Sequence, residues 1–264
     1  MSESRLAERW RAARTERRAA LIPYLPAGFP TPAAFVAAVS EAAAAGADIV
    51  EVGVPFSDPL ADGPVIQRAT HAALAQGVGM ARTLELIRAA RLTVPVVVMT
   101  YLNPVLAYGV ERFLGDAAAA GAAGVLLTDL PAGADPALED QVAAGPLAFV
   151  RLIAPTTPAA RVALAARRAS GFLYLISRLG VTGRSAQGPA DLAAHVARVR
   201  AVSPLPVAVG FGIGTGAQAQ AAARVADGVV VGSALVEVLG SDGVPGVGRL
   251  MRELAAGVRE RGAA

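Results

Sequence analysis

Short apolar runs of strand character alternate with alanine-rich segments of helical character along this chain of 264 residues. Strands separated by helices imply βαβ crossovers and a parallel sheet that is buried on both faces. Eight such units in about 250 residues match the size of a closed barrel, and glycine and polar residues recur directly after the runs, where barrel enzymes build their sites. These three observations predict an α/β fold, a (β/α)8 TIM barrel with an extra N-terminal helix. A doubly wound open sheet is the rival, since alternation alone does not prove closure, but no Gly-x-Gly-x-x-Gly follows the first run.

The expected elements follow in order from the N-terminus. Residues 1–18 are charged, precede every strand-like run and predict a helix that caps the N-terminal end of the barrel. Strands are expected at eight runs: 21–25, 48–54, 96–101, 124–130, 147–153, 172–177, 206–212 and 228–234. Alanine is the best helix former, so helices are expected between the runs, as in 35–46 and 110–121. No linker or low-complexity segment divides the chain, so residues 1–264 are expected to form a single domain.

The composition restricts the chemistry that the chain can perform. All 24 basic residues are arginine, so no lysine can form a Schiff base, which excludes imine-type aldolase chemistry and covalent binding of pyridoxal phosphate. Without cysteine there is no thiolate nucleophile and no disulfide, which agrees with a cytoplasmic protein. The two histidines, His71 and His195, fall on expected helices at a spacing that fits no metal motif, so no metal site is expected. Catalysis must then rest on carboxylates, hydroxyls, arginines and backbone dipoles.

The charge pattern argues against nucleic acid and membrane as partners. The densest basic segment, residues 5–18, is interspersed with Glu8 and Glu16, which favours a solvated amphipathic helix over nucleic-acid binding. No apolar stretch reaches the ~18 residues that a membrane helix needs. The charged N-terminus lacks the apolar region of a secretory signal.

The run EVGVPFSDPLADGP at residues 51–64 carries the strongest functional signal. Glu51 lies inside an apolar strand, where a carboxylate is costly unless it is paired or used, and where burial raises its pKa. Asp62 follows eleven residues later across a proline-rich loop and could face the same cavity. Asp-Gly-Pro is also turn chemistry, so catalysis and turn formation weigh equally for Asp62 on the residues alone. The layout predicts a site that moves protons.

Glycine-bearing turns follow the last three expected strands and predict a phosphate site. Glycine lets the backbone approach a ligand closely, and the N–H groups of a following helix face an anion. Barrel enzymes often bind phosphate between the loops after strands seven and eight. Gly212, Gly232 and Ser233 are expected to donate backbone N–H groups there, and Gly183 to close the site from the preceding loop.

Three aromatic residues lie near strand ends in a chain that has few of them: Tyr24, Tyr174 and Phe211. Each one alone is explained by core packing. Together they indicate a flat apolar group on the ligand.

Six segments, in this order, resemble the tryptophan synthase α subunit: EVGVPFSDPLADGP, MTYLNPVLAYG, LLTDLPA, YLISRLGVTG, VGFGI and VGSALV. The resemblance runs from about residue 20 to beyond residue 250. It implies a (β/α)8 barrel that cleaves indole-3-glycerol phosphate to indole and glyceraldehyde 3-phosphate by a retro-aldol reaction. It also implies an α2β2 assembly, in which a partner β subunit carries the pyridoxal phosphate and receives indole through a tunnel, with no cofactor in this chain.

The resemblance also implies roles for individual residues. The two catalytic acids of the family correspond to Glu51 and Asp62, and the phosphate site to Gly183, Gly212, Gly232 and Ser233. The residues that fall around the family's indole are Tyr24, Met99, Leu126, Tyr174 and Phe211. The mobile lid of the family corresponds to residues 178–190, with Arg178 and Thr182. The segments that face the β subunit in the family contain Asp58, Asn103 and Pro131.

Cleavage of the bond between indole C3 and the glycerol chain requires a protonated ring, because the ring is a poor carbanion. Asp62 is expected to stabilise the charge at the ring nitrogen and to accept the N–H proton. Glu51 is expected to take the hydroxyl proton as the bond breaks and to deliver a proton to C3. Two other functions stay open: a barrel lyase or isomerase that acts alone on another phosphosugar, and a non-catalytic allosteric partner of a β subunit.

Overall fold

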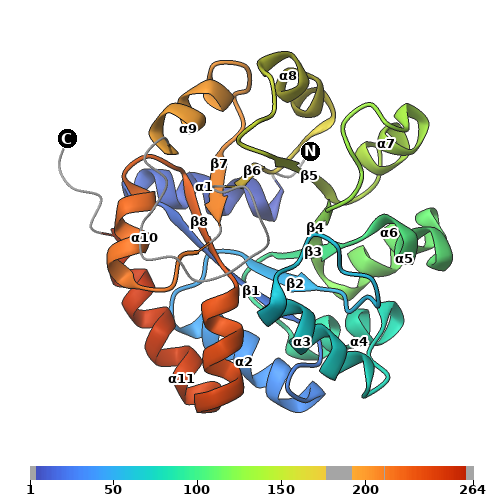
Figure 1. Ribbon diagram of the computed structural model, residues 1–264, viewed down its shortest axis with the longest axis vertical. Helices are drawn as coiled ribbons and strands as arrows, with labels where there is room; N and C mark the ends of the chain where they lie inside the picture. The colour runs from blue at the N-terminus through green and yellow to red at the C-terminus, as the bar shows by residue number, and fades with distance from the viewer. Residues whose placement is uncertain (1–3, 177–191, 211, 260–264) are drawn as a thin grey trace.

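The computed structural model describes residues 4–176, 192–210 and 212–259, and within them eight parallel strands form one closed barrel (Figure 1). The strands are β1 Ala20–Pro26, β2 Val50–Gly53, β3 Val96–Thr100, β4 Ala122–Leu127, β5 Ala148–Ile153, β6 Leu173–Ile176, β7 Val207–Gly210 and β8 Gly228–Val231. Each strand pairs with the next, and β1 pairs with β8, with Ala20 opposite Gly228. The barrel is therefore closed, and the prediction of a (β/α)8 fold is confirmed.

The helices surround the barrel, as Figure 1 shows. They are α1 Arg5–Thr15, α2 Pro32–Ala44, α3 Pro64–Leu74, α4 Met80–Ala90, α5 Leu102–Tyr108, α6 Val110–Ala120, α7 Pro136–Ala143, α8 Ala159–Arg168, α9 Leu192–Arg200, α10 Gly216–Ala223 and α11 Ser233–Arg259. Side chains cap several N-termini: Thr31 accepts from the N–H of Ala34, and Thr215 from that of Gln218. The helix α11 is two helices joined by a kink at Gly243, whose φ of 65° is not helical.

The expected strands are longer than the observed ones at several C-terminal ends. The run 228–234 was expected to be one strand, but β8 ends at Val231 and Ser233 is already the first residue of α11. Within the run 206–212, β7 spans Val207–Gly210. Gly212 and Gly232 therefore lie outside the strands, and Ser233 lies in α11. Apolar content alone does not distinguish the last paired residue from the residues that follow it.

The helix α1 spans Arg5–Thr15 within the expected 1–18 and packs into the barrel interior. Leu6 and Trp10 are buried in the same interior cluster as residues from the strands, and the Trp10 ring lies 5.3 Å from that of Phe172, centroid to centroid. The tip of the indole also lies over Gly228, where a Cβ atom would come within 2.6 Å of it. A side chain at position 228 would therefore displace the Trp10 ring.

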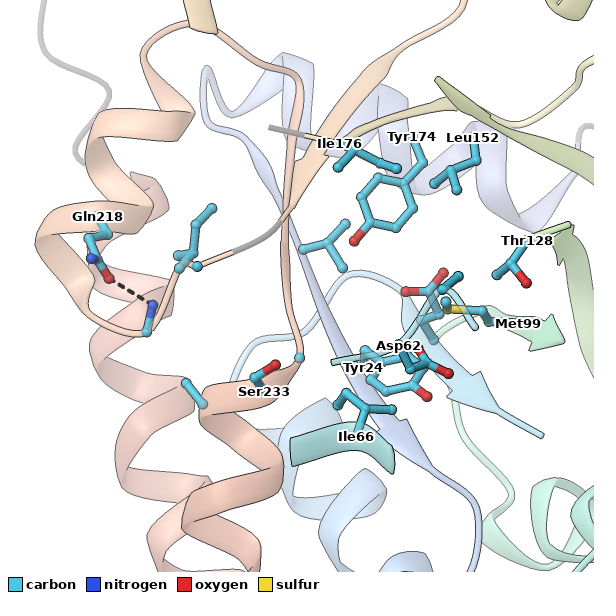
Figure 2. Close-up of a pocket in the computed structure, with 18 of the residues that line it drawn as sticks. Tyr24, Asp62, Ile66, Met99, Thr128, Leu152, Tyr174, Ile176, Gln218 and Ser233 are labelled. Atoms are coloured by element: carbon cyan, nitrogen blue, oxygen red, sulfur yellow. Dashed lines mark hydrogen bonds between the residues drawn. The ribbon is translucent and has the colours of Figure 1, made fainter. Parts of the chain in front are cut away.

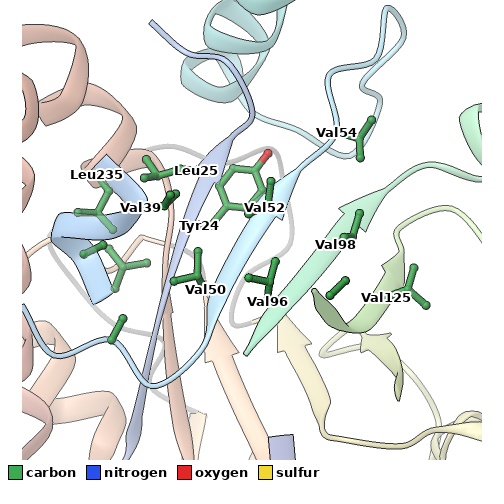
Figure 3. Packing of buried hydrophobic residues seen from close by; sticks show 14 of the residues in the cluster. Tyr24, Leu25, Val39, Val50, Val52, Val54, Val96, Val98, Val125 and Leu235 are labelled. Carbon is green, nitrogen blue, oxygen red and sulfur yellow. The ribbon is translucent and has the colours of Figure 1, made fainter. Parts of the chain in front are cut away.

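The larger core lies between the outside of the barrel and the helices (Figure 3). Val50 and Val52 on β2 belong to this outer cluster, as do Val96 and Val98 on β3. Successive side chains of a strand point to opposite faces. Glu51, between two outward valines, is thereby directed into the barrel.

Candidate active site

A cavity of about 560 Å³ opens at the C-terminal end of the barrel. Figure 2 shows Tyr24, Asp62 and Tyr174 pointing into the same space. Most of the other lining residues are apolar: Ala61, Ile66, Met99, Leu152, Ile176, Ile213, Ala217, Val230 and Ala234. Both predicted acids, Glu51 and Asp62, are among the lining residues. A largely apolar cavity with two carboxylates suits a substrate that has a flat apolar part and undergoes proton transfer.

Glu51 is buried without a hydrogen-bond partner for one of its oxygens. It is 1% exposed, and Oε1 has no partner in the part of the chain that the structure describes. Burial, and next the charge of Asp62, raise the pKa of Glu51 to about 8. The raised pKa expected from an apolar strand is confirmed, and the side chain is mostly protonated at neutral pH.

Asp62 lies in the loop between β2 and α3, where it is both part of a turn and part of the cavity. Its N–H donates to the carbonyl of Pro59, and its own carbonyl accepts from the Gln67 side chain at 2.9 Å. Its carboxylate is buried, and Oδ2 accepts a hydrogen bond of 2.9 Å from the Tyr101 hydroxyl. Burial raises the pKa of Asp62 to about 6, and the hydrogen bond from Tyr101 opposes this rise. Asp62 therefore stays mostly ionised at neutral pH.

The two tyrosines in the cavity each lie over a glycine of a neighbouring strand. Tyr24 on β1 covers Gly53 at the end of β2, and Tyr174 on β6 covers Gly210 at the end of β7. A Cβ atom at either glycine would overlap the phenol ring. Burial and the charges of the two acids raise the pKa of both phenols, so they remain neutral.

Met99 lines the cavity, but Leu126 does not. Leu126 is completely buried in the interior cluster that also holds Trp10 and Val97, and Met99 packs against this cluster. The structure thus brings Tyr24, Met99 and Tyr174 together at the cavity and leaves Leu126 in the packed layer of the barrel interior.

The residues proposed for phosphate lie at the side of the cavity formed after β7 and β8. Gly212, Gly232 and Ser233 all line it. Ser233 begins α11, whose first N–H groups have no intrahelical acceptors and whose dipole favours an anion. The N–H of Gly214 is already used, because it donates to Oε1 of Gln218 at 2.8 Å (Figure 2).

Four predicted residues lie outside the described part of the chain: Arg178, Thr182, Gly183 and Phe211. The three residues expected to face a partner are all exposed. Asp58 lies in the loop after β2, Asn103 in α5 after β3, and Pro131 in the loop after β4. Two large apolar side chains are exposed on the same segments, Leu60 at 87% and Leu106 at 53%.

The sequence did not point to Tyr101, Thr128, Leu152 or Ile176. Leu152 and Ile176 carry a usable signal, because each lies on a strand at an inward position. Tyr101 directly follows β3, where the alternation has ended and nothing local indicates the direction of the side chain. Its contact with Asp62 could be found only from the folded chain.

Two structural absences concern the described residues, 4–176, 192–210 and 212–259. They contain no group of three or more acidic or histidine side chains arranged to hold a metal ion. None of their helices combines the length and the apolar character needed to cross a membrane.

Comparison with known proteins gives a consistent result. A family model described as tryptophan synthase alpha chain matches residues 10–255. A tryptophan synthase alpha chain of Gluconacetobacter diazotrophicus is 47% identical over 259 residues, which cover 96% of this chain and 94% of that protein. A solved tryptophan synthase of Mycobacterium tuberculosis matches with a TM-score of 0.88 at 45% identity, covering 98% of this chain and 99% of that chain. The tryptophan synthase subunit alpha of Legionella pneumophila matches with a TM-score of 0.89 at 34% identity, covering 97% and 99%.

Proposed function

The chain belongs to the tryptophan synthase alpha chain family, and we propose that Glu51 and Asp62 are the two catalytic residues of its reaction. That reaction is the retro-aldol cleavage of indole-3-glycerol phosphate to indole and glyceraldehyde 3-phosphate. The enzyme is a lyase of tryptophan biosynthesis.

One observation carries the assignment of the two acids: they share a cavity but differ in pKa. At neutral pH Glu51, with a pKa of about 8, holds a proton, whereas Asp62, with a pKa of about 6, is mostly ionised. Two titratable groups whose environments separate their pKa values are suited to act as acid and base in one site. Such a pair fits a reaction that needs one proton donor and one stabilising negative charge.

In the proposed mechanism Glu51 moves two protons and Asp62 stabilises a charge. Protonated Glu51 delivers its proton to C3 of the indole ring, so that a C–H bond forms and positive charge develops at the ring nitrogen. Asp62 accepts a hydrogen bond from the ring N–H and stabilises this charge. Glu51, now a carboxylate, takes the proton of the glycerol hydroxyl next to the breaking bond. The electron pair of the C–C bond returns to the ring, indole leaves, and the oxygen-bearing carbon becomes the aldehyde of glyceraldehyde 3-phosphate.

We assign the two ends of the substrate to the two sides of the cavity. The phosphate is held by backbone N–H groups of Gly212, Gly232 and Ser233, and this is supported by the place of all three at the cavity and by the start of α11 at Ser233. The family resemblance adds Gly183, which lies outside the described residues. The indole contacts Tyr24, Met99 and Tyr174, which line the cavity, whereas Leu126 lies in the packed interior beside them. The family resemblance adds Phe211, which lies outside the described residues. The family resemblance assigns Arg178 and Thr182 to the lid, and both lie outside the described residues.

Family membership gives the chain a β-subunit partner, and we propose the α2β2 assembly with that partner. Asp58, Asn103 and Pro131 would face the β subunit, supported by their exposure and by the exposed Leu60 and Leu106 on the same segments. The pyridoxal phosphate belongs to the β subunit, since a chain without lysine cannot hold it as a Schiff base. A single domain and a cytoplasmic location complete the proposal.

Indole release from indole-3-glycerol phosphate, measured with and without added β subunit, tests the proposed function. We expect turnover that the β subunit strongly stimulates, and a loss of about a hundredfold or more in Asp62→Asn. Turnover that does not respond to the β subunit would favour an enzyme acting alone. An absence of turnover under both conditions would favour a non-catalytic partner, and full activity of Asp62→Asn would remove Asp62 from the mechanism.

A further inference from the structure

We propose that Tyr101 is a positioning residue for Asp62: its hydroxyl holds one carboxylate oxygen in place and leaves the other free for the ring N–H of the substrate. The inference rests on the proposed role of Asp62 and adds a residue that the sequence did not indicate. Tyr101 acts through Asp62 and does not contact the reacting atoms.

The polarity of the hydrogen bonds around Tyr101 is fixed. Its hydroxyl oxygen accepts from the backbone N–H of Ala61 at 3.0 Å, and the hydroxyl donates to Oδ2 of Asp62 at 2.9 Å. A hydroxyl has a single proton. Because the Ala61 N–H occupies the acceptor side, that proton is directed to the carboxylate. The Asp62 oxygen accepts this hydrogen bond, as an ionised carboxylate does.

The phenol is held rigidly enough to position a carboxylate. Tyr101 is 4% exposed, and its ring packs against Phe56 with 5.3 Å between the centroids. It is also the residue just before α5, and the N–H of Leu102 donates to Asp129 after β4 at 2.7 Å. The ring is thus fixed by the loop after β2, and the backbone by the end of β4.

The geometry divides the Asp62 carboxylate into two oxygens with different tasks. Oδ2 is occupied by Tyr101, and no other hydrogen bond to the carboxylate is found in the part of the chain that the structure describes. A bond to an ionised acceptor is about twice as strong as a neutral one, so it restricts rotation of the carboxylate. Oδ1 then remains available to a donor in the cavity that Asp62 lines.

The same hydrogen bond opposes the effect of burial on Asp62. Burial favours the neutral acid, whereas a donor to the carboxylate favours the ion and lowers its pKa. The other titratable groups around this pair are Glu51, Tyr24, Tyr174 and Asp129. Glu51 and the two buried tyrosines are neutral at pH 7, so Tyr101 supplies the main contact that keeps Asp62 ionised there.

The variant Tyr101→Phe keeps the ring and removes the hydroxyl. Its kcat/KM for indole-3-glycerol phosphate would be measured from pH 5 to pH 9 with the β subunit present. We expect a loss of about tenfold to a hundredfold at pH 7, since hydrogen bonds to charged groups have effects of that size. Without the donor the pKa of Asp62 rises, so the acidic limb of the profile moves to higher pH by about one unit. The matched control is Tyr108→Phe, which removes the hydroxyl bonded to Asp116 on the surface and leaves the profile unchanged.

A second measurement does not depend on how well Tyr101→Phe folds. Fluorotyrosine at position 101 keeps the packing and makes the phenol a stronger donor, so the acidic limb is expected to move to lower pH. An unchanged limb in both proteins would overturn the role of Tyr101. In an Asp62→Asn background, Tyr101→Phe should have little further effect. If Asp62→Asn is inactive while Tyr101→Phe behaves as wild type, only the inference about Tyr101 fails; if Asp62→Asn is fully active, the proposed function fails.

Discussion

Two acidic side chains three residues apart, Asp48 and Glu51, are both buried, but their hydrogen-bond partners differ. Asp48, just before β2, is 3% exposed and accepts hydrogen bonds from Arg18 at 2.6 and 2.8 Å and from the N–H of Leu21 at 2.9 Å. Glu51, inside β2, is as deeply buried but has an oxygen without a partner in the described part of the chain. Burial alone therefore does not identify a functional acid, whereas burial without a compensating charge does.

The different surroundings of Asp48 and Glu51 correspond to the two ends of the barrel. At the N-terminal end, α1 fills the interior with Leu6 and Trp10, and the buried acid is paired. At the C-terminal end the interior opens into the cavity, and the acids have perturbed pKa values. In barrels of this type the residues at the N-terminal end generally serve stability, and those at the C-terminal end serve catalysis.

The largest expected effect comes from replacing Glu51, the buried acid that has an oxygen without a hydrogen-bond partner in the described part of the chain. Glu51→Gln should lower indole release by about 10²–10⁴-fold, the range for a lost general acid or base, while the far-UV circular dichroism and the affinity for the substrate are kept. Glu85→Gln, at an exposed acid, is the matched control and should retain full activity. Near-normal turnover in Glu51→Gln would contradict its catalytic role.

The paired acid should behave in the opposite way. Asp48→Ala leaves the partly buried Arg18 and the N–H of Leu21 without their acceptor. We expect the free energy of unfolding to fall by about 3 kcal/mol, with unchanged turnover per folded molecule. Urea unfolding and the indole assay measure the two quantities, and a change in turnover without a change in stability would reverse the comparison.

The unpaired acid should itself destabilise the protein at high pH. The pKa of Glu51 is about 8 in the folded state against an ordinary 4.5, so between these values the folded protein binds a proton that the unfolded chain releases. The free energy of unfolding therefore falls as pH rises through this window, by at most about 1.4 kcal/mol per pH unit from this group. Glu51→Gln lacks this contribution, so its stability relative to wild type should increase from pH 5 to pH 8.5. A difference that stays constant with pH would show that Glu51 is not protonated in the fold.

The smallest change in the free energy of unfolding is expected for an ion pair on the surface. Arg82 and Glu85 form an ion pair on α4 with side chains 50% and 56% exposed. Solvent screens such pairs, so Arg82→Ala should change the free energy of unfolding by less than about 0.5 kcal/mol in the urea experiment. A larger loss of unfolding free energy would mean that burial is not what distinguishes Asp48 from the acids on the surface.

Much of the fold could be predicted because its signal is local. The apolar runs between alanine-rich segments predict the strands, and their number predicts the barrel. The valines on either side of Glu51 indicate which face of β2 meets the interior. Strand ends were less accurate, since the run 228–234 was expected as one strand whereas β8 ends at Val231. The start of α11 at Ser233 depends on where pairing with β7 stops, which no short run of residues reveals.

The site was predictable in kind but not in every contact. Glu51 was found because a carboxylate in an apolar strand is locally anomalous, whereas Asp62, in a loop, was assigned only with the family resemblance. Leu126 shows what local patterns miss: it is paired with Met99, which lines the cavity, but is itself completely buried in the interior cluster that holds Trp10. No short run of residues distinguishes the two positions. Tyr101 and Asp62 are far apart in sequence and meet only because the loop after β2 folds back over the end of β3.

The closure of the barrel by β1 and β8 has a consequence for biosynthesis. Ala20 pairs with Gly228, so the first strand leaves the ribosome long before its partner has been made. At about 5–20 residues per second, the nascent chain exposes one edge of β1 for about 10–40 s. Until then the hydrogen-bonding groups of that edge are open to other chains, and the burial that seals the interior can be completed only as the last part of the polypeptide emerges.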